Sequence, residues 1–140
     1  MSDMEALFGA PIHTYTREDA LADGELVDVT HMARDAAFRI DVAMTRAAWV
    51  ETVEWDDERP ELQDEDGRLW DVLHMARTAL HNKATSSDPS GDRVTYRVYR
   101  VPNENRGRGW NAPELIELTV HIGPGDEGEA VVTIMLPNES

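Results

Sequence analysis

The chain has 140 residues, with 28 acidic residues against 13 Lys and Arg and a formal net charge of −15. Its length is typical of one domain, and with no cysteine it has no disulfide, thiolate nucleophile or zinc–thiolate site. The charge disfavours duplex DNA and anionic membranes as partners and favours basic proteins.

The N-terminal region begins with acids where a secretory signal carries Lys or Arg, and no apolar run is long enough to span a bilayer. We therefore expect a cytoplasmic protein. Residues 1–13 lack periodicity and are interpreted as an arm, followed by one α+β domain over residues 14–140.

The first helix signal is a capping box. Thr16 offers an N-cap oxygen, and Asp19 stands at the box position usually held by Glu or Gln. Gly24 supplies a left-handed stop. Together they predict a helix over residues 17–23, and the weak alternation of residues 26–29 indicates a strand.

Two further N-caps are predicted in the next segment. Thr30 is expected to cap a short helix over residues 31–37. Thr45 is expected to cap another that ends near Trp55, because the apolar residues after Thr45 have helical spacing.

The acidic stretch 56–66 is expected to form a loop or hairpin, because it contains Pro60 and ends in Asp66-Gly67, a turn dipeptide. A regular apolar stripe then predicts an amphipathic helix to about Lys83. We expect this stripe to form the core with Trp49 and Val53. The stripe consists of Leu69, Val72, Leu73, Ala76 and Leu80.

The C-terminal third has the amino-acid composition of β-strands. Residues 94–101, 115–122 and 131–136 are rich in Val, Ile, Thr and Tyr and are separated by Gly, Pro and Asn. The expected fold is α+β, a three-stranded antiparallel C-terminal sheet packed by three to four helices from the N-terminal half.

Negative charge is concentrated in one segment. Between residues 51 and 66 there are nine acids, with Arg59 as the one base. Such a segment is either a solvated face or a surface that binds a basic partner. Its acids are Glu51, Glu54, Asp56, Asp57, Glu58, Glu61, Asp64, Glu65 and Asp66.

Positive charge is concentrated between residues 93 and 108. Arginines interleaved with aromatics have the composition of a nucleic-acid stacking surface, although neighbours such as Tyr96 and Arg97 face opposite sides of a strand. The alternative is that these arginines form ion pairs with the acidic segment, either within the molecule or between copies in a homo-oligomer. The candidate residues are Arg97, Arg100, Arg106, Arg108 and Trp110.

A second stripe lies beside the apolar face of the predicted long helix. It consists of Trp70, His74, Arg77 and His81. Two histidines about 10.5 Å apart along the axis cannot share one metal, so the stripe is either a binding surface with an aromatic anchor or a Trp at the core edge with polar neighbours.

No motif for catalysis or metal binding is evident. The glycine-rich turn at residues 123–126 follows a strand, but no helix pattern follows it, so it predicts a hairpin and not a phosphate loop. The acidic spacing does not fit an EF-hand. We expect no cofactor or metal and no enzymatic activity; a site assembled from residues far apart in sequence is the remaining enzymatic alternative.

Three stretches resemble a family of small uncharacterised proteins carried on bacterial plasmids and phages. They are residues 14–17 with 23–29, residues 63–73, and residues 122–126 with 133–139. The resemblance extends from about residue 15 to the C-terminus and carries no catalytic residue. It implies a mobile-element setting. His74 stands where that family has a large aromatic residue.

Charge and resemblance together suggest a non-enzymatic inhibitor or adaptor. The acidic segment would bind a basic host protein, such as a nucleic-acid-binding nuclease, as DNA mimics of the anti-restriction or anti-CRISPR type do. The alternative is an accessory nucleic-acid-binding module that uses residues 93–110.

Overall fold

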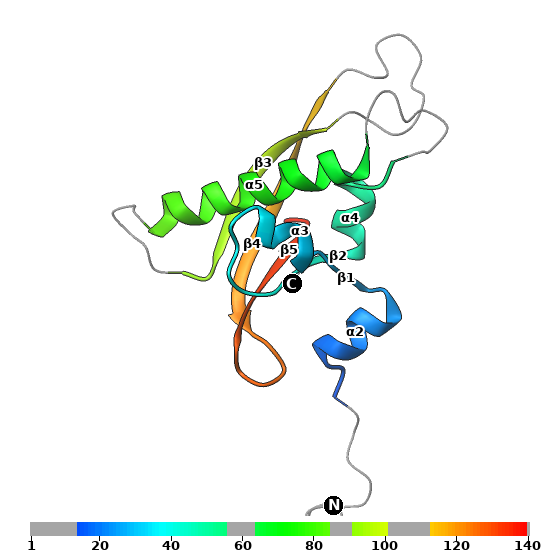
Figure 1. The fold of residues 1–140 in the computed structure, drawn as a ribbon, viewed down its shortest axis with the longest axis vertical. Coiled ribbons are helices and arrows are strands. Elements are labelled where there is room, and N and C mark those ends of the chain that lie inside the picture. Colours follow the sequence, from blue (N-terminus) through cyan, green and yellow to red (C-terminus); the bar gives the residue numbers. More distant parts are fainter. Residues whose placement is uncertain (1–13, 56–63, 85–90, 101–112, 140) are drawn as a thin grey trace, which may run out of the picture.

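The computed structural model describes residues 14–55, 64–84, 91–100 and 113–139. Four helices and five strands lie within these ranges (Figure 1). In chain order they are α2 (Arg17–Asp23), β1 (Leu26–Asp28), α3 (Thr30–Asp35), β2 (Val42–Thr45), α4 (Arg46–Thr52), α5 (Glu65–Ala84), β3 (Arg93–Arg100), β4 (Glu114–Pro124) and β5 (Ala130–Met135). None of the described helices has the length and apolar character needed to cross a bilayer.

The strands form one mixed sheet in the order β1-β2-β5-β4-β3. β2 runs parallel to β5, whereas all other neighbours are antiparallel. The α+β class is as expected, but the prediction of a three-stranded antiparallel sheet is wrong. The three C-terminal strands lie within two residues of their predicted bounds, and β1 and β2 extend the sheet beyond β5.

β2 escaped prediction because it is covered on both faces. Val42 and Met44 belong to the main core, and Ala43, which points to the opposite face, is 2% exposed. A strand buried on both sides has no alternation of apolar and polar residues, so its sequence carries no period of two.

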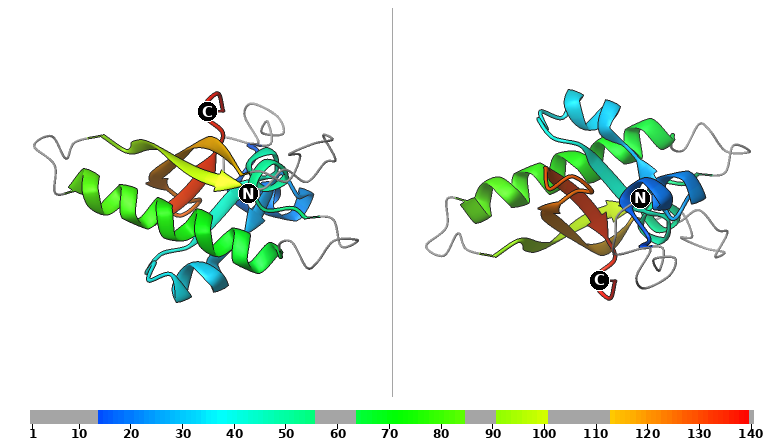
Figure 2. Two further views of the ribbon diagram at one scale, coloured as in Figure 1. Left: turned by 90° about the horizontal axis from the view of Figure 1, so that it is seen from above. Right: turned by 90° about the horizontal axis from the view of Figure 1, so that it is seen from below.

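α5 packs across one face of the sheet and makes the main layer of the fold (Figure 2). Its buried residues are the predicted Leu69, Val72, Leu73 and Ala76, together with Arg68. Val53 is also buried, as predicted, whereas Trp49 and Leu80 lie partly buried at the margin of the core. From the sheet, the core receives Tyr96, Val98, Leu118, Val120, Val132 and Ile134.

α5 begins about one turn earlier than predicted. The carboxylate of Asp64 accepts a hydrogen bond from the Gly67 backbone N–H, and the Asp64 carbonyl accepts one from Arg68. Two more acids in the first turn favour a helix start because they interact well with its positive end. The predicted turn at Asp66-Gly67 is therefore wrong, and both residues are helical.

Two of the three predicted caps are confirmed. Thr16 Oγ1 accepts from the Asp19 N–H at 3.0 Å, the Asp19 carboxylate accepts from the Thr16 N–H at 3.1 Å, and the helix stops at Gly24 with φ 82°. Thr45 Oγ1 accepts from the Ala48 N–H at 3.1 Å. Thr30 is not a cap, because its hydroxyl is turned to β2 instead.

α3 ends in a Schellman motif that has alanine at the left-handed position. The Phe38 N–H donates to the Ala33 carbonyl at 2.9 Å and the Ala37 N–H donates to the Arg34 carbonyl at 3.0 Å, while Ala37 has φ 73°. Glycine is usual here because it has no Cβ to clash with the following carbonyl.

Substituting Leu73→Ala should lower the free energy of unfolding by about 2–5 kcal/mol, because Leu73 is fully buried between α5 and the sheet. Urea denaturation measures this loss. The matched control is Met75→Ala on the exposed side of the same helix, which should change stability by less than about 0.5 kcal/mol. Equal effects would contradict the packing of α5.

Substituting Ala37→Gly should raise the free energy of unfolding by up to about 1 kcal/mol. Relief of the left-handed strain is worth about 1–2 kcal/mol, and the greater freedom of glycine in the unfolded chain offsets part of it. The same change one residue earlier, Ala36→Gly, should destabilise, since Ala36 has φ −85° and is buried. A lower urea midpoint for Ala37→Gly would argue against this account.

Candidate functional site

The predicted acidic segment lies at the junction of α4 and α5. Asp56, Asp57, Glu58 and Glu61 fall outside the described residues. The other five members flank them and are partly or fully exposed: Glu51, Glu54, Asp64, Glu65 and Asp66.

Three of these five carboxylates have partners inside the molecule. Glu51 contacts the Arg100 guanidinium at 3.0 Å, and Glu65 accepts a hydrogen bond from the Trp55 backbone N–H at 3.2 Å. Asp64 caps α5. Part of the acidic charge therefore stabilises the local fold, which leaves Glu54 and Asp66 as the described members with no ion pair or side-chain hydrogen bond to another described residue.

Two buried guanidinium groups lie at this same end. Arg68 is 3% exposed, donates from Nε to the Val53 carbonyl at 3.0 Å and lies over the Trp55 ring at 4.9 Å. Burial lowers the pKa of Arg68, and the positive charge of Arg100 lowers it further. Arg100 is 8% exposed and has Glu114 as a second carboxylate at 3.6 Å. The described ends of the acidic and basic segments thus meet in the fold through Arg100.

The nucleic-acid candidates are not brought to one surface by β3. Arg100 is buried, whereas Arg97 points to the exposed side with Tyr99, whose side chain is 72% exposed. Arg97 is also 3.7 Å from Glu117. The remaining candidates, Arg106, Arg108 and Trp110, lie outside the described residues.

The stripe on α5 divides into two parts. Trp70 and His74 stack with ring centroids 6.0 Å apart and an angle of 13° between the planes, and both are exposed. One to two turns further along, Arg77 donates to the Ala37 carbonyl at 3.4 Å, and His81 lies with Arg77 on the wall of a separate groove. The four residues do not form one binding site.

A pocket that the sequence did not indicate lies where α2, β1, β2 and the β4–β5 hairpin meet. Its volume is about 190 Å³, and we call it the Arg17 pocket. One guanidinium and five carboxylates line it. The carboxylates belong to Glu18, Asp28, Asp41, Asp126 and Glu129.

Arg17 is fixed against the sheet by neutral acceptors. Its guanidinium donates to Thr133 Oγ1 at 2.7 Å and to the Val132 carbonyl at 2.8 Å. Partial burial lowers the pKa of Arg17, and the nearby Asp126 and Asp41 carboxylates act in the opposite direction. The group stays charged, since an arginine pKa lies far above neutrality.

Asp126 joins the hairpin to α2. Its two carboxylate oxygens accept from the backbone N–H groups of Arg17 at 2.8 Å and Glu18 at 2.9 Å. This tertiary cap adds to the local cap by Thr16 and satisfies donors that a helix N-terminus otherwise leaves open. The arrangement holds the α2 side of the pocket against the hairpin.

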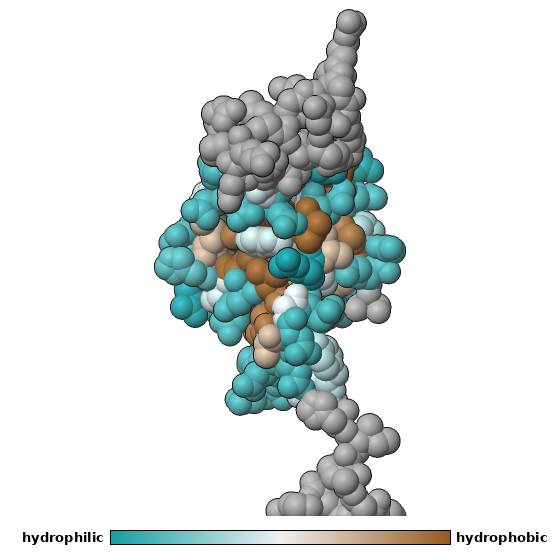
Figure 3. Space-filling model, turned by 90° about the vertical axis from the view of Figure 1, so that its right-hand side faces the viewer, coloured by the Kyte–Doolittle hydropathy of each residue, from teal (hydrophilic) through white to brown (hydrophobic). Residues whose placement is uncertain are grey.

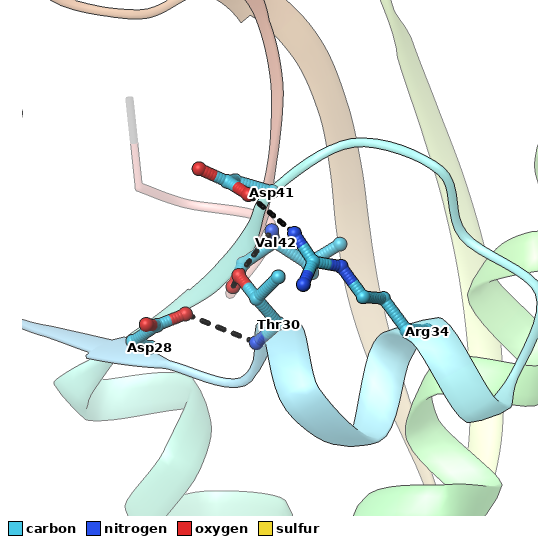
Figure 4. Close-up of polar contacts among 5 residues, drawn as sticks. All are labelled: Asp28, Thr30, Arg34, Asp41 and Val42. Atoms are coloured by element: carbon cyan, nitrogen blue, oxygen red, sulfur yellow. Dashed lines mark hydrogen bonds and ion pairs between the residues drawn. The ribbon is translucent and has the colours of Figure 1, made fainter.

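The opposite wall is built around the hydroxyl of Thr30 (Figure 4). Thr30 Oγ1 accepts from the Val42 N–H at 3.0 Å and donates to the Val42 carbonyl at 3.2 Å, while the Thr30 N–H donates to Asp28 at 3.0 Å. Asp41 points outward and lies 3.7 Å from Arg34, with both side chains about two-thirds exposed. The Thr30 N–H thereby holds Asp28 at one side of the pocket.

The pocket has an excess of negative charge because its lining includes five acidic residues and one arginine. Within the part of the chain that the structure describes, no group of three or more His, Asp or Glu residues is arranged to hold a metal ion. A concave surface of this charge attracts an ammonium or guanidinium group, which donates hydrogen bonds to carboxylate oxygens.

The sequence offered no signal for this pocket. Its carboxylates are separated by up to 111 positions and come from a helix, a strand end, a connection and a hairpin. The turn at residues 123–126 was predicted to be a hairpin, which is confirmed by the antiparallel pairing of β4 with β5. Nothing in that turn indicated that Asp126 would cap α2.

Substituting Thr30→Val should lower the free energy of unfolding by about 1–3 kcal/mol, because the buried Val42 N–H would lose its partner. Thr30→Ser keeps the hydroxyl and should retain most of that stability. Thermal or urea unfolding of the two variants measures the difference. A Ser variant as unstable as the Val variant would argue that the methyl group, and not the hydroxyl, matters.

Comparison with known proteins identifies the family. No curated protein and no solved structure matches the chain. One family model does match, that of a family of unknown function, DUF6573, and the match covers residues 4–140. Since this range is nearly the whole sequence, the chain belongs to the DUF6573 family.

Proposed function

We propose that this protein is a non-enzymatic binding module that recognises a basic partner protein through its carboxylates. The observation that carries the proposal is the Arg17 pocket, where five carboxylates from separate parts of the chain line one concavity. The acidic segment 51–66 is a second contact in the proposal.

A Lys or Arg side chain of a partner fits the chemistry of the Arg17 pocket. Glu18 and Glu129 are exposed, and Asp41 is exposed too although it lies 3.7 Å from Arg34, so a partner can reach all three. The Arg17 guanidinium lies on the sheet side of the pocket, where it donates to Thr133 and Val132. The net charge of −15 would also speed encounter with a basic surface.

The distribution of apolar and polar side chains on the surface supports a protein as the partner. The face seen in Figure 3, which lies to the right in Figure 1, has apolar side chains gathered at its centre inside a hydrophilic margin. α4 lies on this side and exposes Val50, whose side chain is 46% exposed. An apolar centre with a polar rim is the usual anatomy of a protein interface.

At a finer level, we propose a DNA mimic that neutralises a host defence nuclease, of the anti-restriction or anti-CRISPR kind, encoded on a plasmid or phage. Lys and Arg residues placed to meet phosphates also meet carboxylates, and both ligands accept charge-assisted hydrogen bonds. This identification rests on the charge and on the resemblance of the sequence to proteins of mobile elements.

The test compares two sets of three charge-removing substitutions. Glu18→Gln, Asp41→Asn and Glu129→Gln change the pocket and avoid Asp126, which holds α2. The control set, Asp35→Asn, Asp71→Asn and Glu117→Gln, removes the same charge from other exposed positions. Each protein is immobilised, proteins captured from a bacterial lysate are quantified by mass spectrometry, and association rates of the main captured protein are then measured.

The pocket set should slow association with a basic captured protein about tenfold at 0.15 M salt, and the control set less than about twofold. The effect should shrink as salt rises because exposed charges are screened over about 8 Å. Equal slowing by both sets would show that the pocket residues act only through the net charge of the protein. A captured partner that is not basic would overturn the proposal. A third variant, Asp56→Asn, Asp57→Asn, Glu58→Gln and Glu61→Gln, measures the share of the acidic segment.

A further inference from the structure

A second concave site lies on the α5 side of the sheet and has the opposite character. It is a groove of about 390 Å³ between the α3–β2 connection, the C-terminal half of α5, and strands β4 and β5. Its walls are largely apolar, and Ile122 on β4 leaves 37% of its side chain exposed there. The large apolar residues of the walls are Phe38, Ile40, Leu80, Ile122 and Val132.

The polar groups of the groove are basic. Arg39, Arg77 and His81 line it, and no carboxylate occurs among its described lining residues. This is unusual in a chain that has more than twice as many acids as bases. The local charge therefore differs in sign from the charge of the molecule.

Arg39 and Arg77 each have guanidinium N–H donors that make no hydrogen bond to a described residue. Arg77 uses Nε for the Ala37 carbonyl at 3.4 Å, and its terminal nitrogens have no partner among the described residues. Arg39 is exposed and makes no ion pair or side-chain hydrogen bond with a described residue. In contrast, Arg34, Arg97 and Arg100 each lie within 4 Å of a carboxylate.

We propose that this groove binds a small apolar molecule that carries a carboxylate, of the medium-chain fatty-acid class. The apolar tail would lie along Leu80 and Ile122, and the carboxylate would meet the planar fork of Arg77, with Arg39 as a second donor. The volume falls within the range of small-molecule sites, which are mainly apolar and have a few polar groups that fix orientation. Arg is the side chain best suited to hold a carboxylate by two hydrogen bonds.

Two electrostatic effects define where the carboxylate binds. The C-terminal end of α5 carries partial negative charge, which places the carboxylate near Arg77, two turns before that end at Ala84. The acids elsewhere repel an anion, but screening over about 8 Å at physiological salt leaves the adjacent arginines dominant. Added salt should therefore weaken binding, whereas dominance of the net charge would make salt strengthen it.

The experiment titrates the full chain by calorimetry with three probes of equal chain length: octanoate, octanol and octylamine. Octanoate should bind at least tenfold more tightly than octanol, because a charge-assisted bidentate contact replaces a neutral one. Octylamine should bind most weakly. Lengthening the acid by one methylene should tighten binding up to about fourfold until the groove is filled. Equal affinity for the three probes, or no octanoate binding at millimolar concentration, would overturn the proposal.

Matched variants locate the site. Arg77→Gln and Arg39→Gln should each weaken octanoate binding about tenfold and leave octanol binding within twofold. Arg46 is an exposed arginine on α4 outside the groove, so the control Arg46→Gln should change the binding of neither probe. Ile122→Thr keeps a β-branched strand residue and should weaken both probes, while Leu115→Thr on the same strand should not. Loss of octanoate binding in the Arg46 or Leu115 controls would place the site elsewhere and refute the assignment.

Discussion

The parallel pairing of β2 with β5 is the interaction on which the rest of the structure depends. Val42 is paired with Val132 and Met44 with Ile134, although these residues are about 90 positions apart in the sequence. The pairing attaches the β1–β2 unit to the C-terminal hairpin and brings Val42 and Met44 into the main core. It also brings Asp41 beside β5, where the Asp41 carbonyl accepts from the Val132 N–H at 2.9 Å.

Residues that are adjacent in the sequence next to this pairing line different sites, and this explains why two sites of opposite charge lie at the same strands. Ile40 lines the groove and Asp41 lines the Arg17 pocket. Likewise the side chain of Val132 lines the groove, while its carbonyl holds Arg17 on the other side. A shift of the β2–β5 register by one residue would exchange the faces and disrupt both sites.

The acidic charge is tolerated because many carboxylates also have structural roles. Asp126 caps α2, Asp64 caps α5, and Glu51 lies against the buried Arg100. Crowded like charges oppose folding, and such contacts offset part of that repulsion. Among the described carboxylates, Glu18 and Asp66 make no ion pair or side-chain hydrogen bond with another described residue.

The sequence by itself determined the elements whose signals are local: the capping box at Thr16, the N-cap at Thr45, the apolar stripe of α5 and the three C-terminal strands. Each signal depends on side chains within one or two turns or along one strand. Only the tertiary structure decided the place of β2, which has no period because both its faces are buried. The helical state of Gly67 depends on local contacts, because Asp64 and the first-turn acids outweigh the turn dipeptide. The tertiary structure also decided both concave sites, because charge and shape there arise from residues such as Arg17, Asp126 and Ile122, which become neighbours only when the strands pair.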